Sequence, residues 1–157
     1  MLTTLSNRQT LLAICIVTTA VILGAYGFEY AGYAPCELCL KQRFAYYAVI
    51  PLSLLFALLD VKLQRSGLYL IAAIMLGSMI FGIYHSGVEW KFWQGPSTCT
   101  GGSLSGGLPD LTKQPVMCDQ PAIRILGLSL AGWNAVISAV VAWAAFNRAQ
   151  GSSSASQ

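Results

Sequence analysis

Three long stretches of the chain, residues 10–28, 66–88 and 125–147, contain no Asp, Glu, Lys or Arg. A helix needs about 17–25 mostly apolar residues to cross the hydrocarbon core of a bilayer. Only 10% of the residues are charged, 55% are hydrophobic and the mean hydropathy is +0.61, whereas about a quarter of the residues in a soluble domain carry charge. The sequence therefore predicts an integral membrane protein that crosses the bilayer as helices.

A fourth apolar run, residues 44–59, is shorter than the others. A helix that begins near Cys36 would lengthen it to a span over residues 40–59, with Lys41 and Arg43 reaching toward the headgroups. We therefore predict an all-α, polytopic protein, a bundle of four transmembrane helices with a longer, partly irregular loop between the third and the fourth. No internal repeat is visible, so residues 1–148 are expected to form one domain and the Ser-rich residues 149–157 a disordered tail.

The first apolar run could also belong to a secretory signal, because Arg8 precedes it. However, residues 10–28 exceed the usual h-region of about 7–15 residues, and no clear small-residue cleavage site follows residues 26–30. We expect this run to be a retained helix.

Four spans would put both termini on one side of the membrane and four of the five cysteines on the other. Lys and Arg are nearly balanced between the two sides, so the positive-inside rule does not orient the chain. Disulfides persist in the periplasm and are rare in the cytosol. The cysteine loops are therefore predicted to be periplasmic and the termini cytoplasmic.

A Cys-x-x-Cys motif, Cys36 and Cys39, stands at the start of the second predicted span, directly after Pro35. Proline suits the first turn of a helix, and the free amides at that end favour negative charge. Arg43 is four residues beyond Cys39, so on a helix its guanidinium would lie close to that sulfur and stabilise a thiolate. Such a motif also serves zinc sites, but its junction with a membrane helix and a second cysteine pair favours redox chemistry.

The second pair, Cys99 and Cys118, lies in the longest polar loop. The glycines around Cys99 disfavour regular structure, so we expect this thiol to be mobile and exposed. A static disulfide staple is the alternative. All four cysteines could also form a tetrahedral zinc centre, but such sites commonly use two short knuckles, and Cys99 with Cys118 is not one. Cys15, in the first span, is expected to act as a small packing residue.

His85 is the only histidine and lies near the outer end of the third predicted span. An ionisable group inside a membrane span is a functional candidate, and the predicted topology brings His85 to the same face as Arg43. Both could donate hydrogen bonds to a small carbonyl ligand. The alternative is an interfacial anchor among Tyr84, Trp90 and Trp93.

These features together resemble the DsbB-type disulfide bond formation proteins of bacterial inner membranes. The resemblance covers nearly the whole chain: four spans, the CxxC motif with Arg43, the Tyr84–His85 pair, the loop pair Cys99 and Cys118, and the run over residues 126–134 at the start of the last span. It implies a thiol:quinone oxidoreductase, without a metal or a flavin, that reoxidises a periplasmic thioredoxin-fold oxidase similar to DsbA.

By this resemblance, the partner's thiolate attacks Cys99, Cys118 then exchanges with Cys36, and Cys39 passes electrons to ubiquinone or menaquinone with Arg43 and His85 as quinone-binding residues. Exchange needs an accessible sulfur and a good leaving thiolate, and an apolar, lipid-borne quinone suits a site between helices. We also expect a monomer in the lipid bilayer, because four spans can enclose the site alone, and no nucleic-acid partner.

Two alternative functions remain. The quinone-linked vitamin K epoxide reductase type combines the same elements, but its quinone-facing CxxC follows the loop pair, whereas here the CxxC comes first. A non-catalytic scaffold stapled by two disulfides would give no reason for Arg43 beside Cys39. Some features depart from the best-known members of the family and leave the choice of partner open. They are the compact second loop, Glu37, the Lys41–Gln42 pair and the additional Cys15.

Overall fold

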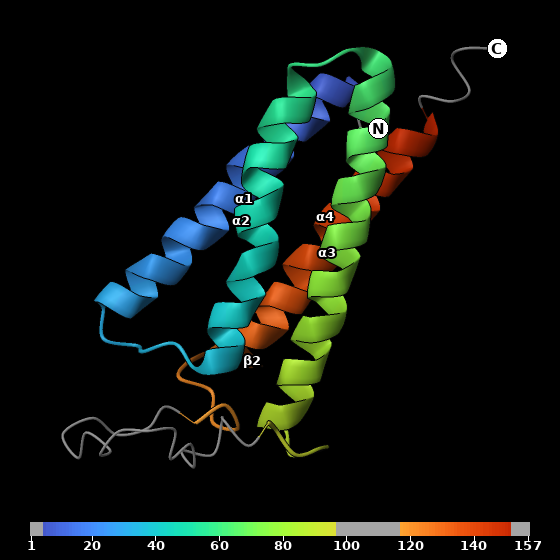
Figure 1. Ribbon diagram of the computed structural model, residues 1–157. Coiled ribbons are helices and arrows are strands. Elements are labelled where there is room, and N and C mark those ends of the chain that lie inside the picture. The colour runs from blue at the N-terminus through green and yellow to red at the C-terminus, as the bar shows by residue number, and fades with distance from the viewer. Residues whose placement is uncertain (1–4, 97–116, 152–157) are drawn as a thin grey trace, which may run out of the picture.

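The computed structural model describes residues 5–96 and 117–151 and is mostly helical (Figure 1). Its four helices are α1 (Asn7–Tyr30), α2 (Glu37–Ala57), α3 (Val61–Glu89) and α4 (Leu130–Gly151). A short antiparallel hairpin, β1 (Arg124–Ile125) with β2 (Leu128–Ser129), precedes α4. The predicted all-α, four-helix fold is confirmed, with this hairpin as an unpredicted addition.

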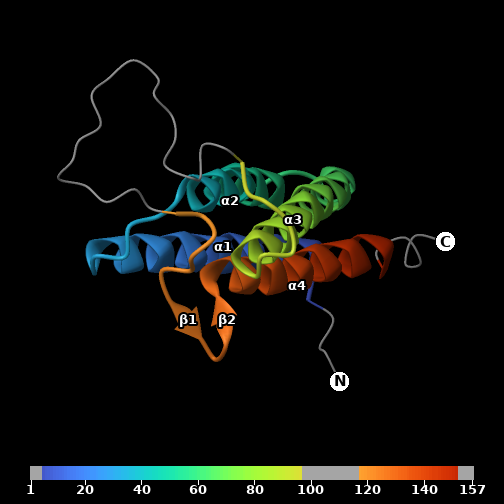
Figure 2. The same cartoon turned by 90° about the horizontal axis from the view of Figure 1, so that it is seen from below.

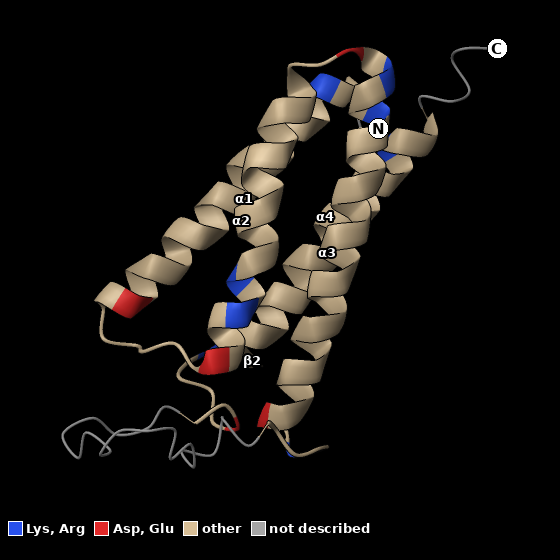
Figure 3. Cartoon of the chain, in the orientation of Figure 1, with Lys and Arg blue, Asp and Glu red and all other residues tan. Residues whose placement is uncertain are grey.

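The helices run alternately up and down, so α1 begins and α4 ends at one end of the bundle (Figure 1). The α1–α2 connection and the hairpin lie at the opposite end, and Figure 2 shows the hairpin beside the start of α4. Among the described residues, Lys, Arg, Asp and Glu lie toward the two ends of the bundle, and its middle contains none of them (Figure 3). This arrangement brings the described CxxC motif and Cys118 to the same end.

Three helices, α1, α3 and α4, are long and apolar enough to cross a membrane. Helix α2 is less apolar because its first turns contain Lys41, Gln42 and Arg43. Its 21 residues nevertheless correspond to about 31 Å at 1.5 Å per residue, close to the thickness of a hydrocarbon core.

The predicted end of the last helix differs from the observed one. Helix α4 continues through residues 149–151, which the sequence assigned to the tail, because Ala149 is fully buried and its carbonyl accepts a hydrogen bond from Arg65 Nε at 3.1 Å. At the other end, α4 begins at Leu130 rather than at residue 125. Leu126 (φ 52°) and Gly127 (φ 85°) both adopt left-handed backbone, as the central residues of a tight hairpin turn do.

Helices α3 and α4 form the most extensive helix contact of the bundle, and Gly82 permits their close approach. A Cβ atom on Gly82 would lie 3.0 Å from the backbone nitrogen of Ala135. Gly77, on the same helix, has nothing within 4 Å of an added Cβ. Small residues commonly allow membrane helices to pack this closely.

We therefore expect Gly82→Leu to lower the free energy of unfolding by about 1–3 kcal/mol through overpacking. Gly77→Leu is the matched control, since the same change there enters open space and should leave stability nearly unchanged. Thermal unfolding of both variants in detergent micelles measures the difference. Equal melting temperatures for the two variants would contradict the described α3–α4 contact.

Candidate redox site

The two sulfurs of the CxxC motif lie at the start of α2. Cys36 is the N-cap of this helix and its sulfur accepts the Cys39 backbone N–H at 3.2 Å. Both thiols are free, and their sulfurs are 2.7 Å apart. Cys36 is buried and Cys39 is half-buried. This geometry permits a dithiol and a disulfide to interconvert with little movement of the backbone.

Cys36 is the sulfur that the surroundings stabilise as a thiolate. The hydrogen bond from the Cys39 thiol, followed by that with His85, lowers the pKa of Cys36 to about 5, although burial opposes the shift. The sequence alone predicts the stabilised thiolate at Cys39. The structure differs because the helix-capping position belongs to Cys36, and because α3 brings the imidazole to that sulfur.

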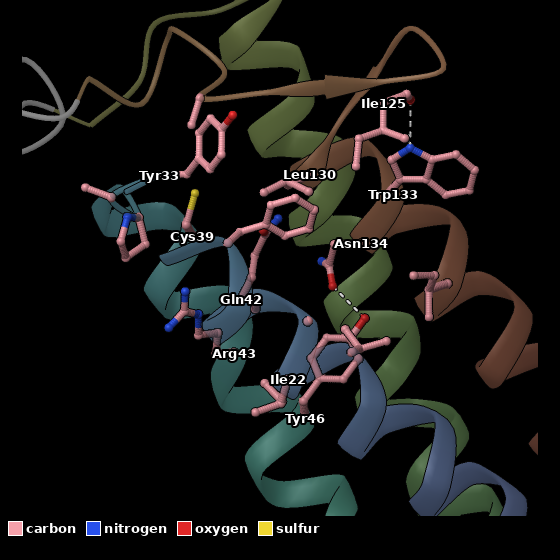
Figure 4. A pocket seen from close by; sticks show the side chains of 18 residues that line it. Ile22, Tyr33, Cys39, Gln42, Arg43, Tyr46, Ile125, Leu130, Trp133 and Asn134 are labelled. Carbon is pink, nitrogen blue, oxygen red and sulfur yellow. Dashed lines mark hydrogen bonds between the residues drawn. The ribbon is translucent and has the colours of Figure 1, made fainter. Parts of the chain in front are cut away.

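Arg43 forms an ion pair that the sequence did not predict. Its Nη1 donates to Glu29 Oε2 at 2.8 Å, and its guanidinium lies 5.1 Å from the centre of the Tyr26 ring. Arg43 and Cys39 line the same cavity, as Figure 4 shows. The guanidinium is therefore near the CxxC motif, but its negative partner is a carboxylate at the end of α1.

His85 is only 1% exposed and lies against the CxxC motif. Its Nε2 is 3.5 Å from Cys36 Sγ and 3.8 Å from Glu89 Oε1. It is not among the residues that line the cavity with Arg43, so a shared ligand for the two side chains stays a prediction. The anchor role suits Trp93 better, since this exposed ring stacks on Tyr84.

Cys118 is 1% exposed and packs in one apolar cluster with Cys36, Leu38 and Val88. It is disulfide-bonded. An ion pair between Lys91 and Asp119 ties its segment to the end of α3. Cys99, the other predicted loop cysteine, lies outside the described residues. The packing brings Cys118 and the CxxC motif, which are far apart in sequence, into one cluster.

The structure bears on the alternative of a metal site at the cysteines and on the role of Cys15. A four-cysteine zinc centre does not fit, because the disulfide leaves Cys118 no thiolate to offer a metal. The sulfurs of Cys36 and Cys39 and the His85 nitrogen all lie within 4.8 Å of one another, so the reduced pair could hold a soft metal ion. Cys15 is half-buried in α1, with its sulfur 3.7 Å from the Ile50 carbonyl oxygen, as a packing residue would be.

A cavity of about 380 Å³ opens beside Cys39, between α1, α2, the α1–α2 connection, the hairpin and α4 (Figure 4). Its walls are mostly apolar. The hairpin forms one side of it and is held on α4 by a hydrogen bond from Trp133 Nε1 to the Ile125 carbonyl at 2.9 Å. A concave, apolar site with a few polar groups is the usual form of a small-molecule site.

Polar residues that the sequence analysis did not assign to the site line this cavity. They are Gln42 on α2, and Tyr46 with Asn134, whose side chains are joined by a 2.7 Å hydrogen bond between α2 and α4. Their signal in the sequence is a polar side chain within a predicted span, which is costly in a membrane unless it has a partner or a role. Which helix face they occupy depends on tertiary packing.

The fold and the site thus define a helical membrane protein with a thiol–disulfide centre beside an apolar cavity. The family model described as "Disulfide bond formation protein DsbB" matches residues 7–147. The chain belongs to the DsbB family, and its role is accordingly in disulfide bond formation.

Two relatives that carry the name of the family agree with this assignment, and a third relative has no assigned role. Over 142 residues the chain is 30% identical to "Disulfide bond formation protein B" of Cupriavidus metallidurans, covering 83% of this chain and 85% of the relative. The protein of the same name from Pseudomonas syringae pv. tomato is 30% identical over 139 residues, covering 81% and 80%. The Rickettsia prowazekii protein RP370 is 34% identical over 143 residues, covering 84% and 83%. No solved structure matches the chain.

Proposed function

We propose that this protein is a thiol:quinone oxidoreductase of the bacterial inner membrane that reoxidises a periplasmic dithiol oxidase similar to DsbA. One observation carries the proposal: the CxxC pair lies between two different environments. Cys36 is buried within the cluster that contains Cys118, whereas Cys39 packs against the edge of that cluster and also lines the apolar cavity, which Cys36 does not. Electrons that arrive from a protein dithiol on one side can therefore leave to a lipid-borne acceptor on the other.

In the first step, we propose that Cys99 is the disulfide partner of Cys118. A thiolate of the soluble partner attacks Cys99 and Cys118 leaves as a thiolate. The partner's second thiol then displaces Cys99, so the partner becomes a disulfide and the loop pair gains two electrons. Exchange proceeds through such mixed disulfides.

In the second step, Cys118 attacks Cys36 in the oxidised CxxC pair and Cys39 leaves. Cys99 then displaces Cys36, which restores the loop disulfide and leaves Cys36 and Cys39 reduced. The burial of Cys118 in the cluster of Cys36 supports this transfer. The lowered pKa of Cys36 supports it too, because it stabilises the reduced product.

A membrane quinone bound in the cavity would be the final acceptor of the two electrons and two protons that Cys36 and Cys39 give up when their disulfide reforms. The cavity walls would hold its apolar ring beside Cys39. Arg43 lies on the same wall, where its positive charge, paired with Glu29, would stand beside the ring. His85 can take a proton at Nε2 from Cys36, with the Glu89 carboxylate next to it.

The proposed topology has four spans, with α2 as the second. Its 21-residue length supports this assignment, and Lys41 and Arg43 would then lie near the periplasmic headgroups. Both termini would be cytoplasmic and the cysteine loops periplasmic. One chain contains every residue assigned to the site, so a monomer is sufficient.

A trapping experiment tests the proposed entry of electrons. A DsbA-like partner that lacks its second active-site cysteine cannot displace Cys99, so a disulfide-linked complex should accumulate on a non-reducing gel. Peptide mapping should locate the link at Cys99, and Cys99→Ser should abolish it, whereas Cys15→Ser should not. A link that maps to Cys118 or Cys36 would refute the proposed order of exchange.

A further inference from the structure

Two buried carboxamides lie on the walls of the cavity beside Cys39. Gln42 is 8% exposed and Asn134 is 9% exposed. Among the described residues, neither Gln42 Nε2 nor Asn134 Nδ2 has a hydrogen-bond partner. Figure 4 shows the two amide groups directed into the cavity, Gln42 from α2 and Asn134 from α4. Because buried N–H groups are rarely left unpaired in proteins, both amides point to a ligand that accepts hydrogen bonds.

The orientation of the Asn134 amide is fixed by the hydroxyl group of Tyr46. The Tyr46 hydroxyl donates to Asn134 Oδ1 at 2.7 Å. That hydroxyl also lies 3.1 Å from Ser138 Oγ, which donates to Ser78 Oγ at 3.0 Å. Since the oxygen of Asn134 is engaged inside the bundle, its two N–H bonds are left for the cavity.

Gln42 lies three residues beyond Cys39, so both side chains occupy the same face of α2. An acceptor atom held by Gln42 would therefore lie near the sulfur that lines the cavity. The other candidate donors are less suitable. Arg43 is already paired with Glu29, and His85 does not line the cavity.

We infer that the carboxamides of Gln42 and Asn134 position the quinone ring by donating hydrogen bonds to its carbonyl oxygens, one from α2 and one from α4. A quinone is flat, apolar and neutral, with carbonyl acceptors on opposite edges, so it matches apolar walls that carry neutral donors. The inference rests on the proposed function, because it takes quinone as the ligand of this cavity.

A difference between the oxidised and reduced ligand follows. Carbonyl oxygens of a quinone only accept hydrogen bonds, whereas each hydroxyl group of a quinol also brings a hydrogen, which the amide N–H groups cannot accept and which needs a partner elsewhere. The two carboxamides should therefore bind the quinone more tightly than the quinol. This preference would help the product to leave the site.

Equilibrium binding of a short-chain ubiquinone and its quinol tests this inference without turnover, in protein that carries Cys39→Ser. We expect Asn134→Leu and Gln42→Met each to raise the dissociation constant for the quinone about tenfold, as the loss of one hydrogen bond to a buried acceptor does. The double variant should lose about a hundredfold if the amides act on different oxygens. In each variant, the dissociation constants for quinone and quinol should also differ less than they do in the protein without the substitution.

Asn147→Leu is the matched control, because this exposed asparagine of α4 bonds only within its own helix, to the Trp143 carbonyl at 3.0 Å. In protein that keeps Cys39, thiol exchange with the partner should be unchanged in every variant, which separates quinone binding from loss of fold. If Asn134→Leu does not fold, Asn134→Ala removes the same N–H groups without adding bulk.

The outcomes separate the inference from the proposed function. Weaker quinone binding in the cavity variants, with the control unchanged, supports the inference. Quinone binding in the parent protein that neither cavity substitution weakens overturns the inference and leaves the proposed function standing. A parent protein that binds neither ubiquinone nor menaquinone overturns both.

Discussion

Cys36→Ser is expected to stop continuous oxidation of the soluble partner, with a loss of at least about a thousandfold in steady-state rate, the scale seen when a covalent catalytic group is removed. Serine is among the best helix N-cap residues, so the variant keeps the cap that Cys36 provides to α2. The lost activity would then reflect the missing sulfur and not a frayed helix.

The variant should still carry out part of the reaction. Its loop disulfide can oxidise one equivalent of partner per protein, after which no route leads from Cys118 to the cavity. A rapid-mixing experiment with reduced partner and quinone should thus show a single turnover and no quinone loss. Cys15→Ser is the control and should turn over normally, since Cys15 lies in α1 away from the CxxC motif. Sustained turnover in Cys36→Ser would contradict the proposed route.

The second large effect concerns the acidity of the reduced CxxC pair. We expect the thiolate absorbance of the reduced protein near 240 nm to titrate with a midpoint near pH 5, because hydrogen bonds from Cys39 and His85 lower the pKa of Cys36 to about 5. An ordinary cysteine titrates near 8.5. At pH 6 the thiolate should therefore be the main form, compared with less than about 1% for an ordinary thiol.

This lowered pKa determines the direction of two linked effects, one on the stability of the reduced protein and one on the reduction potential of the cysteine pair. The thiolate stabilises the reduced folded protein fully above the pKa of the unfolded chain, and this contribution is lost as the pH falls through about 5. Each unit of lowering also raises the reduction potential of the pair by about 30 mV, which makes Cys36–Cys39 a better acceptor of electrons.

His85→Leu should raise the midpoint of this titration and lower the reduction potential, because it removes the imidazole 3.5 Å from Cys36 Sγ. The thiolate absorbance and equilibration with a glutathione buffer measure the two quantities. A substitution at exposed Tyr30, such as Tyr30→Leu, serves as the control at the same end of the bundle. A midpoint near pH 8.5 in the parent protein would refute the assigned thiolate.

The membrane class and the four helices could be predicted from the sequence because charge-free runs and a helix-starting Pro35-Cys36 pair are local signals. The short hairpin at residues 124–129 could not be predicted. Its turn contains Leu126, a non-glycine residue with positive φ, and lies within an apolar run that looks like the start of the last span. The ion pair of Arg43 with Glu29 also needed the structure. It depends on how α1 and α2 cross rather than on spacing along either helix.

The identity of the redox cysteines could be proposed from spacing, but their separate environments could not. The sequence favoured Cys39 as the stabilised thiolate because Arg43 is four residues away. Only the packing of α3 against α2 reveals that His85 faces Cys36. In the same way, the sequence identifies Asn134 only as a polar residue within a predicted span. The structure places it between its hydrogen-bond partner Tyr46 and the cavity.

The most direct test of the central claim is quinone reduction by the purified protein with a reduced DsbA-like partner. Ubiquinone and menaquinone analogues of short chain length would be followed by absorbance, with the parent protein and Cys39→Ser. We expect loss of quinone only when the partner thiols and Cys39 are both present, with one quinol formed per partner disulfide. No loss of either quinone, in protein whose disulfides are intact, would contradict the account and favour a disulfide-stapled scaffold.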